Sequence, residues 1–189
     1  MNLKKIENTD NQEKLMKWAM KSKYDTDIRM AAVRKITDQN MLHTIIRDAD
    51  RGSVAIVAAK KLDNQTLAQK TYVQMAKNGY AEAVDMIKSH DDLAHVALRC
   101  GNSIIAVLAM NRITDKKRVQ QICFQIVTDT KNSLGMRKGV FNTLEKGDQE
   151  KFDFRTRHGD NSSCYPHIDY EWNEYKLKPG ALPPYPEKK

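Results

Sequence analysis

The fold is decided by the stretch Ile28-Arg-Met-Ala-Ala-Val-Arg-Lys-Ile-Thr-Asp-Gln-Asn-Met-Leu42, which returns 26 residues later as Val54-Ala-Ile-Val-Ala-Ala-Lys-Lys-Leu-Asp-Asn-Gln-Thr-Leu-Ala68. A small residue recurs at Ala32, Ala58, Ala83 and Ala109. A large aliphatic residue follows four positions later each time, at Ile36, Leu62, Ile87 and Ile113. Both columns step by 26, 25 and 26 residues. Similarity at a fixed short period predicts a repeat architecture.

Each copy of the repeat has the pattern of a helix, a tight turn and a second helix. In the first copy Ile28, Ala32 and Ile36 lie on one helical face. Each aliphatic residue is followed by a polar tetrad suited to capping the next helix, at residues 37–40, 63–66, 89–92 and 114–117. One such pair cannot cover its own apolar face, so neighbouring pairs must stack, and the alanine column allows them to approach closely.

We therefore expect an all-α fold, a right-handed α-solenoid of about five short helix-pair repeats with a period of about 26 residues. The repeat domain spans residues 1–155, with copies at about 25–50, 51–77, 78–100, 101–128 and 132–155. The last copy is looser and runs from Met136 through Val140 to Leu144. Residues 10–22 are expected to form an N-terminal capping helix that Asp10-Asn-Gln-Glu13 opens as a capping box, with Trp18 in the core.

Residues 156–189 form an irregular tail rich in aromatic residues and proline. Pro179-Gly180 and Pro183-Pro184 rule out a continuous helix, yet 6 of the 13 aromatic residues lie in residues 153–189. We expect this extended tail to pack on the last repeats as structural cover, and contact with a partner or a second copy of the chain stays open. His158, Cys164 and His167 form a weak metal pattern, because zinc needs four ligands in tetrahedral geometry. No metal site is predicted.

Composition sets limits on the compartment. The first fifteen residues lack a signal-peptide core, and no apolar run is long enough to cross a membrane. Three cysteines without a CxxC pair favour a cytoplasmic protein with reduced thiols. The net charge of +8 divides into +3 in residues 1–24, +5 in residues 25–152 and zero in residues 153–189. Because this excess looks mild and spread out, a nucleic-acid partner is permitted but not indicated.

The sequence offers no constellation for catalysis. Cys100 and Cys123 fall on core positions, where a thiol behaves as a small hydrophobe, and the glycines form no phosphate-binding loop. The carboxylates lie mostly at helix starts, where capping explains them. We predict no enzyme, no catalytic residue and no cofactor.

Two columns of residues are candidates for binding a partner. A basic ridge precedes the aliphatic column, at Lys35, Lys61 and Arg112, with Met86 in between. A polar row lies on the outer face of the second helices, at Thr44, Lys70, His95 and Gln121, with Gln74, Arg99 and Gln125 one turn on. Placement of cations at helix C-termini is the favoured explanation of the ridge, and an ordinary solvated face is the favoured explanation of the row.

The pattern [Ile/Val]-x3-Ala-x-x-Lys-[Leu/Ile]-[Thr/Asp]-[Asp/Asn]-Gln, at Ile28–Gln39 and Val54–Gln65, resembles the short-unit bacterial HEAT-like repeat proteins over residues 25–150. The resemblance implies an α-solenoid whose second helices line a concave surface that holds another macromolecule. The expected function is a non-enzymatic scaffold that binds a protein partner there. The alternative is a nucleic-acid-binding protein of the DNA-repair type, using its positive charge, and self-association through the tail is a third possibility.

Overall fold

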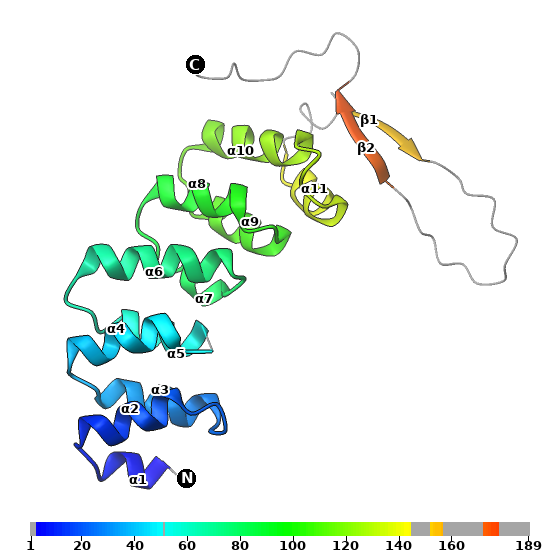
Figure 1. Cartoon of the computed structure of the whole chain (residues 1–189). Coiled ribbons are helices and arrows are strands. Elements are labelled where there is room, and N and C mark those ends of the chain that lie inside the picture. The colour runs from blue at the N-terminus through cyan, green and yellow to red at the C-terminus, as the bar shows by residue number, and fades with distance from the viewer. Residues whose placement is uncertain (1–2, 51, 145–151, 157–171, 178–189) are drawn as a thin grey trace, which may run out of the picture. The chain divides into compact units, whose positions relative to one another are not determined.

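The computed structural model describes residues 3–50, 52–144, 152–156 and 172–177, and for the last two segments it describes the backbone (Figure 1). The described part is a succession of short helices followed by two strands. The helices are α1 (Leu3–Glu7), α2 (Gln12–Met20), α3 (Thr26–Lys35), α4 (Gln39–Asp48), α5 (Gly52–Ala59), α6 (Gln65–Lys77), α7 (Ala81–Val84), α8 (His90–Arg99), α9 (Ser103–Asn111), α10 (Lys116–Thr128) and α11 (Leu134–Phe141). Strands β1 (Phe152–Thr156) and β2 (Trp172–Leu177) pair antiparallel, with Phe152 opposite Leu177.

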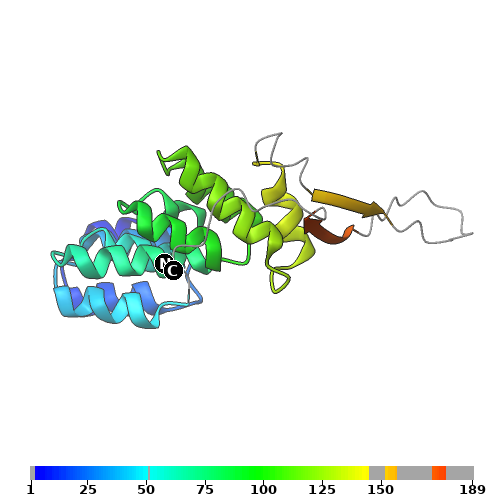
Figure 2. The same ribbon diagram turned by 90° about the horizontal axis from the view of Figure 1, so that it is seen from above.

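The chain divides into two compact units, residues 1–96 and 97–189. In the first unit α2 packs on α3, α4 packs on α5, and α6 packs on α5 and α7. The first helices also pack side by side, as α3 does with α1 and α5, and α2 packs beside α4. In the second unit α11 packs on α10 and α9, and β2 lies against α10, as Figure 2 shows from above. Helices therefore pack pairwise in chain order within each unit.

The polar tetrads cap the second helices as predicted. The Asp38 side chain accepts from the amides of Asn40 and Met41 at the start of α4, and the Asn64 side chain accepts from Leu67 at the start of α6. Ser89 and Asp115 do the same for α8 and α10. These bonds satisfy amides that have no partner inside the helix, which fixes where each second helix begins.

The core follows the two predicted columns. Ala32, Ala58, Ala83 and Ala109 are each 0% exposed, and the aliphatic column of Ile36, Leu62, Ile87 and Ile113 is buried throughout. At two glycines the neighbouring side chain lies so close that there is no room for a Cβ atom. A Cβ atom on Gly52 would stand 2.2 Å from the ring of Tyr80, and one on Gly139 would stand 2.5 Å from the side chain of Ser103. A small residue is therefore required where α11 meets α9, at Gly139.

The N-terminal end differs from its prediction. A further helix, α1, precedes the predicted capping helix, and Asn11 rather than Asp10 is the N-cap of α2, since its side chain accepts from the amide of Lys14. Asp10 instead pairs with Lys35, at 3.0 Å. Trp18, expected in the core, is half-buried.

The C-terminal end differs as well. Strand β1 begins inside the region where the fifth copy was expected to continue to residue 155, and β2 lies in the predicted tail. The residues Phe152–Arg155 of β1 alternate apolar and polar, which suits a strand better than a helix, whereas in β2 the register shifts where Asn173 and Glu174 follow each other. Apart from the contact of β2 with α10, the expected docking of the tail lies outside the described residues, as does the pattern of His158, Cys164 and His167.

Candidate interaction surface

The basic ridge does not stand free on the surface. The Nζ atom of Lys35 donates to the carbonyl of Glu7 at 2.7 Å, and the Nζ atom of Lys61 donates to the carbonyl of Arg34. Both carbonyls lie at the end of the preceding first helix, so each lysine satisfies an orphan acceptor one copy back. Burial lowers the pKa of Lys61. Arg112, the third member of the ridge, is exposed. At Lys35 and Lys61 the structural interpretation of the ridge therefore has direct support.

A second set of contacts joins successive copies through glutamine side chains. Gln39 accepts from the amide of Asp63 at 3.1 Å and donates to the carbonyl of Lys61 at 3.3 Å, so it holds the backbone on both sides of Leu62. Gln12 holds the backbone around Ile36 in the same way, and Gln69 the backbone around Ile87. Gln120 donates to the carbonyl of Thr143, next to Leu144. These glutamines form clamps that align α2, α4, α6 and α10 with the first helix that follows each of them.

The clamp contributes a measurable part of the stability of the first unit. We expect Gln39→Leu to lower the free energy of unfolding by about 1 kcal/mol, because two hydrogen bonds are lost while the side-chain volume is kept. Urea unfolding followed by circular dichroism measures this change. Gln125→Leu is a suitable control, since Gln125 is exposed on α10. Equal effects of the two substitutions would contradict the clamp.

Two buried arginines complete the internal bonding. Arg29 on α3 is 1% exposed, and its Nε atom donates to the carbonyl of Ala19 at 2.7 Å. Arg137 occupies the same repeat position on α11, is 6% exposed, and donates to the carbonyl of Val127, also at 2.7 Å. Each arginine therefore binds an acceptor in the last turn of the preceding second helix, α2 or α10, where a cation also complements the helix dipole.

The polar row of the second helices lies where it was predicted. In the first unit Lys70, Gln74 and His95 are exposed and Thr44 is half-buried. In the second unit Arg99 and Gln125 are exposed and Gln121 is half-buried. Thr44 donates to the carbonyl of Asn40, and Gln74 donates to the side chain of Asn78, so each bonds to a residue one helical turn away. The exposed members are available to a partner, and their binding role stays a prediction.

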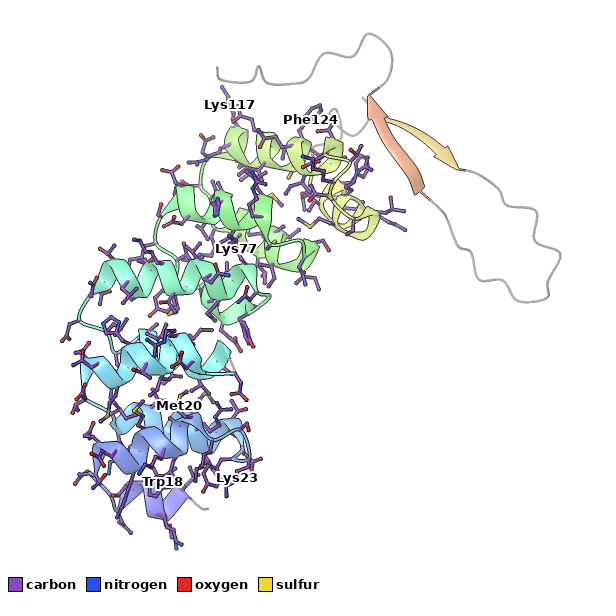
Figure 3. The ribbon with its side chains drawn as sticks, in the orientation of Figure 1. Trp18, Met20, Lys23, Lys77, Lys117 and Phe124 are labelled. Carbon is purple, nitrogen blue, oxygen red and sulfur yellow. The ribbon has the colours of Figure 1, made fainter. Side chains whose placement is uncertain are left out.

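The positive charge is concentrated in residues 97–144, which the charge totals over longer ranges do not reveal. Residues 25–96 carry ten basic and ten acidic residues, while residues 97–144 carry eight basic and two acidic residues, a net charge of +6. Lys116, Lys117 and Arg118 open α10, and Lys117 lies at its exposed start (Figure 3). Counting over shorter windows would have found this segment. Cations in the first turn oppose the helix dipole, so helix stability does not explain them.

The two described cysteines are poor nucleophiles. Cys123 is buried and its Sγ atom lies 3.0 Å from the Thr143 hydroxyl, and Cys100 is half-buried and donates to the carbonyl of Asn102. Burial raises the pKa of both thiols. Cys100 was expected fully in the core, but it sits just past the end of α8, where part of it reaches solvent. Among the described residues no group of three or more His, Cys, Asp or Glu side chains could hold a metal ion.

The raised thiol pKa values predict that both thiols react slowly with a disulfide reagent. In a Cys164→Ser variant at about pH 8, we expect a disulfide reagent to label Cys100 slowly and Cys123 only on unfolding, because burial keeps both as thiols. Since the native state holds the Cys123 proton more tightly than the unfolded chain does, stability from this group is lost as the pH rises through its raised pKa. Absorbance of the released thiolate, with and without denaturant, measures the rates. Rapid labelling of both thiols in the native protein would contradict the assignment.

Neither the helices nor the comparisons assign the chain to a family. No helix in the described part of the chain is long and apolar enough to span a membrane. The architecture that the structure supports is a set of short helices packed pairwise in sequence order. A scan of protein-family models, a search of curated proteins and a search of solved structures each found no match to this chain.

Proposed function

We propose that this chain is a non-enzymatic interaction module, a HEAT-like α-solenoid that holds a protein partner on the outer face of its second helices. The observation that carries the proposal is that the polar residues fall into two groups, one that bonds between copies and one that stays exposed. The glutamine clamps, the two buried arginines and the paired lysines Lys35 and Lys61 bond between successive copies. The row of Lys70, His95, Arg99 and Gln125 stays exposed.

This division suits a scaffold. Within each unit, bonds between copies hold neighbouring helices in register, so the exposed residues can vary in chemistry without loss of the fold. A surface presented by rigid helices also binds with less ordering cost than a surface on loops. Fold-level resemblance alone is a modest argument for function, and the exposed row is what makes the proposal specific.

The test uses two matched double variants of the full chain. Lys70→Glu with Gln125→Glu changes the proposed face, and Lys60→Glu with Asn142→Glu makes the same charge change at exposed positions elsewhere. Each protein is immobilised and exposed to extract of the source cells, and bound proteins are quantified by mass spectrometry. We expect a partner that the wild type and the control variant retain, and that the face variant loses by about tenfold or more.

Two outcomes would overturn the proposal. Equal retention by both double variants would show that the second-helix face is not used. Loss of all bound protein after nuclease treatment would show that the retained ligand is nucleic acid, whose binding should also weaken steeply with salt.

A further inference from the structure

The described residues include an apolar stripe that internal packing leaves exposed. Ile104 is 69% exposed and Leu108 is 39% exposed, and both lie on α9. Residues four apart on a helix share a face, so the two side chains form one stripe. The core of the same helix is built by Ile105, Ala106, Ala109 and Met110. Nothing in the internal packing of α9 requires aliphatic residues at the two exposed positions.

The helix beside this stripe leaves room for a partner. α11 packs next to α9, where Gly139 lies against Ser103. One turn earlier on α11, Gly135 is exposed, and no atom stands within 4 Å of the place where its Cβ would be. Alanine would stabilise a helix better at such a position. The helix that carries the stripe therefore packs against a helix whose surface is open at Gly135.

The segment that contains the stripe is strongly positive. Residues 97–144 carry the net charge of +6, and Arg112, the C-cap of α9, follows Leu108 by one helical turn. The exposed cations of the segment are Arg99, Arg112, Lys116, Lys117, Lys131 and Lys138. Its two carboxylates accept from backbone amides at the start and just past the end of α10, Asp115 from Arg118 and Asp129 from Lys131. A ligand for this surface should combine apolar side chains with negative charge.

We propose that the outer face of α9, formed by Ile104 and Leu108 in a segment of net charge +6, docks an acidic amphipathic segment of a partner protein. Charge complementarity separates this occupant from the others. A second copy would bring its own +6 to the same surface. Nucleic-acid bases stack on aromatic rather than aliphatic side chains, and a membrane surface calls for a longer apolar face than two residues. Arg99 is shared with the second-helix row, but Ile104 and Leu108 are not part of that row, so either proposal can fail alone.

The experiment selects peptides from a random library displayed on phage, using the full chain as bait. The selection is repeated against Ile104→Ser with Leu108→Ser, and against Leu3→Ser, which removes the exposed aliphatic side chain of α1 (50% exposed). We expect the wild type to enrich peptides of net negative charge with aliphatic or aromatic residues at helical spacing. Their affinity, measured by fluorescence anisotropy, should fall about tenfold or more in the double variant and stay unchanged in Leu3→Ser. All three proteins should unfold at the same urea concentration.

Several results would overturn this proposal. No enrichment, enrichment of neutral or basic peptides, or equal affinity for the double variant would remove the acidic segment as the occupant. A single-stranded oligonucleotide or a phosphatidylserine vesicle whose binding depends on Ile104 and Leu108 would replace it with a nucleic acid or a membrane. A dimer in gel filtration that the double variant dissociates would replace it with a second copy.

Discussion

Replacing Arg29 with methionine is expected to lower the free energy of unfolding of the first unit by about 2–3 kcal/mol. The guanidinium is 1% exposed, and it donates to the carbonyl of Ala19 and forms an ion pair with Asp50. Methionine fills most of the same volume but donates nothing, so an acceptor in the last turn of α2 loses its partner inside the protein. Half of the Asp50 side chain reaches solvent, which limits the cost on that side.

The readout can be confined to the affected unit. The chain has two tryptophans, and Trp18 lies on α2, the helix whose end Arg29 binds. In a Trp172→Phe background the fluorescence of Trp18 therefore follows the first unit during urea unfolding. The midpoint should fall while the denaturant dependence stays constant.

Two further variants separate the possible causes. Arg34 is an exposed arginine on the same helix, so Arg34→Met should change stability by less than about 0.5 kcal/mol. Arg29→Lys keeps the charge but not the planar fork that reaches two acceptors, and it should recover only part of the loss. If Arg29→Met proved as harmless as Arg34→Met, the arginine would not be what holds α2 to α3.

The sequence predicted what a single copy determines. The alanine and aliphatic columns follow from the helical period, and caps such as Asp38 and Asn64 follow from short side chains just before an apolar helix. These features depend on neighbours within a few residues, so one copy of the repeat carries the whole signal. The short helices and their pairwise order could therefore be read from the sequence.

The contacts between copies could not be read in the same way. Lys35 was expected to complement its own helix, whereas it reaches a carbonyl 28 residues earlier. The glutamine of the clamp stands at the first position of α4 but at the fifth position of α6, so no fixed column marks it. Arg29 and Arg137 share a repeat position, but the copies between them carry other residues there. Such contacts depend on how two copies are aligned, which the period alone does not fix.

The same reasoning applies to the candidate surface. The polar row could be predicted, because exposure follows from the helical period once the core face is known. The stripe of Ile104 and Leu108 was missed, because aliphatic residues in an apolar helix look like core until the burial of each one is known. Strand β1 was missed because residues 152–155 were assigned to the fifth helical copy, and β2 was missed because it lies in a segment that was expected to be irregular.

Within α11, alanine at two glycine positions is expected to have opposite effects. Gly139→Ala should lower the free energy of unfolding by about 1–3 kcal/mol, because the new Cβ would stand 2.5 Å from the side chain of Ser103 and force α9 and α11 apart. Gly135→Ala should raise it by about 0.4–1 kcal/mol, since nothing stands within 4 Å of its Cβ and alanine reduces the freedom of the unfolded chain.

The two variants control for each other, because both make the same chemical change in one eight-residue helix. Helix propensity alone would stabilise both, so a loss at Gly139 measures the close approach of α9 and α11 and nothing else. Thermal unfolding followed by circular dichroism at one protein concentration gives both shifts. Combining Gly139→Ala with Ser103→Gly removes the atoms that the new Cβ meets and should recover part of the loss. Stabilisation by Gly139→Ala would show that the two helices do not pack at this point.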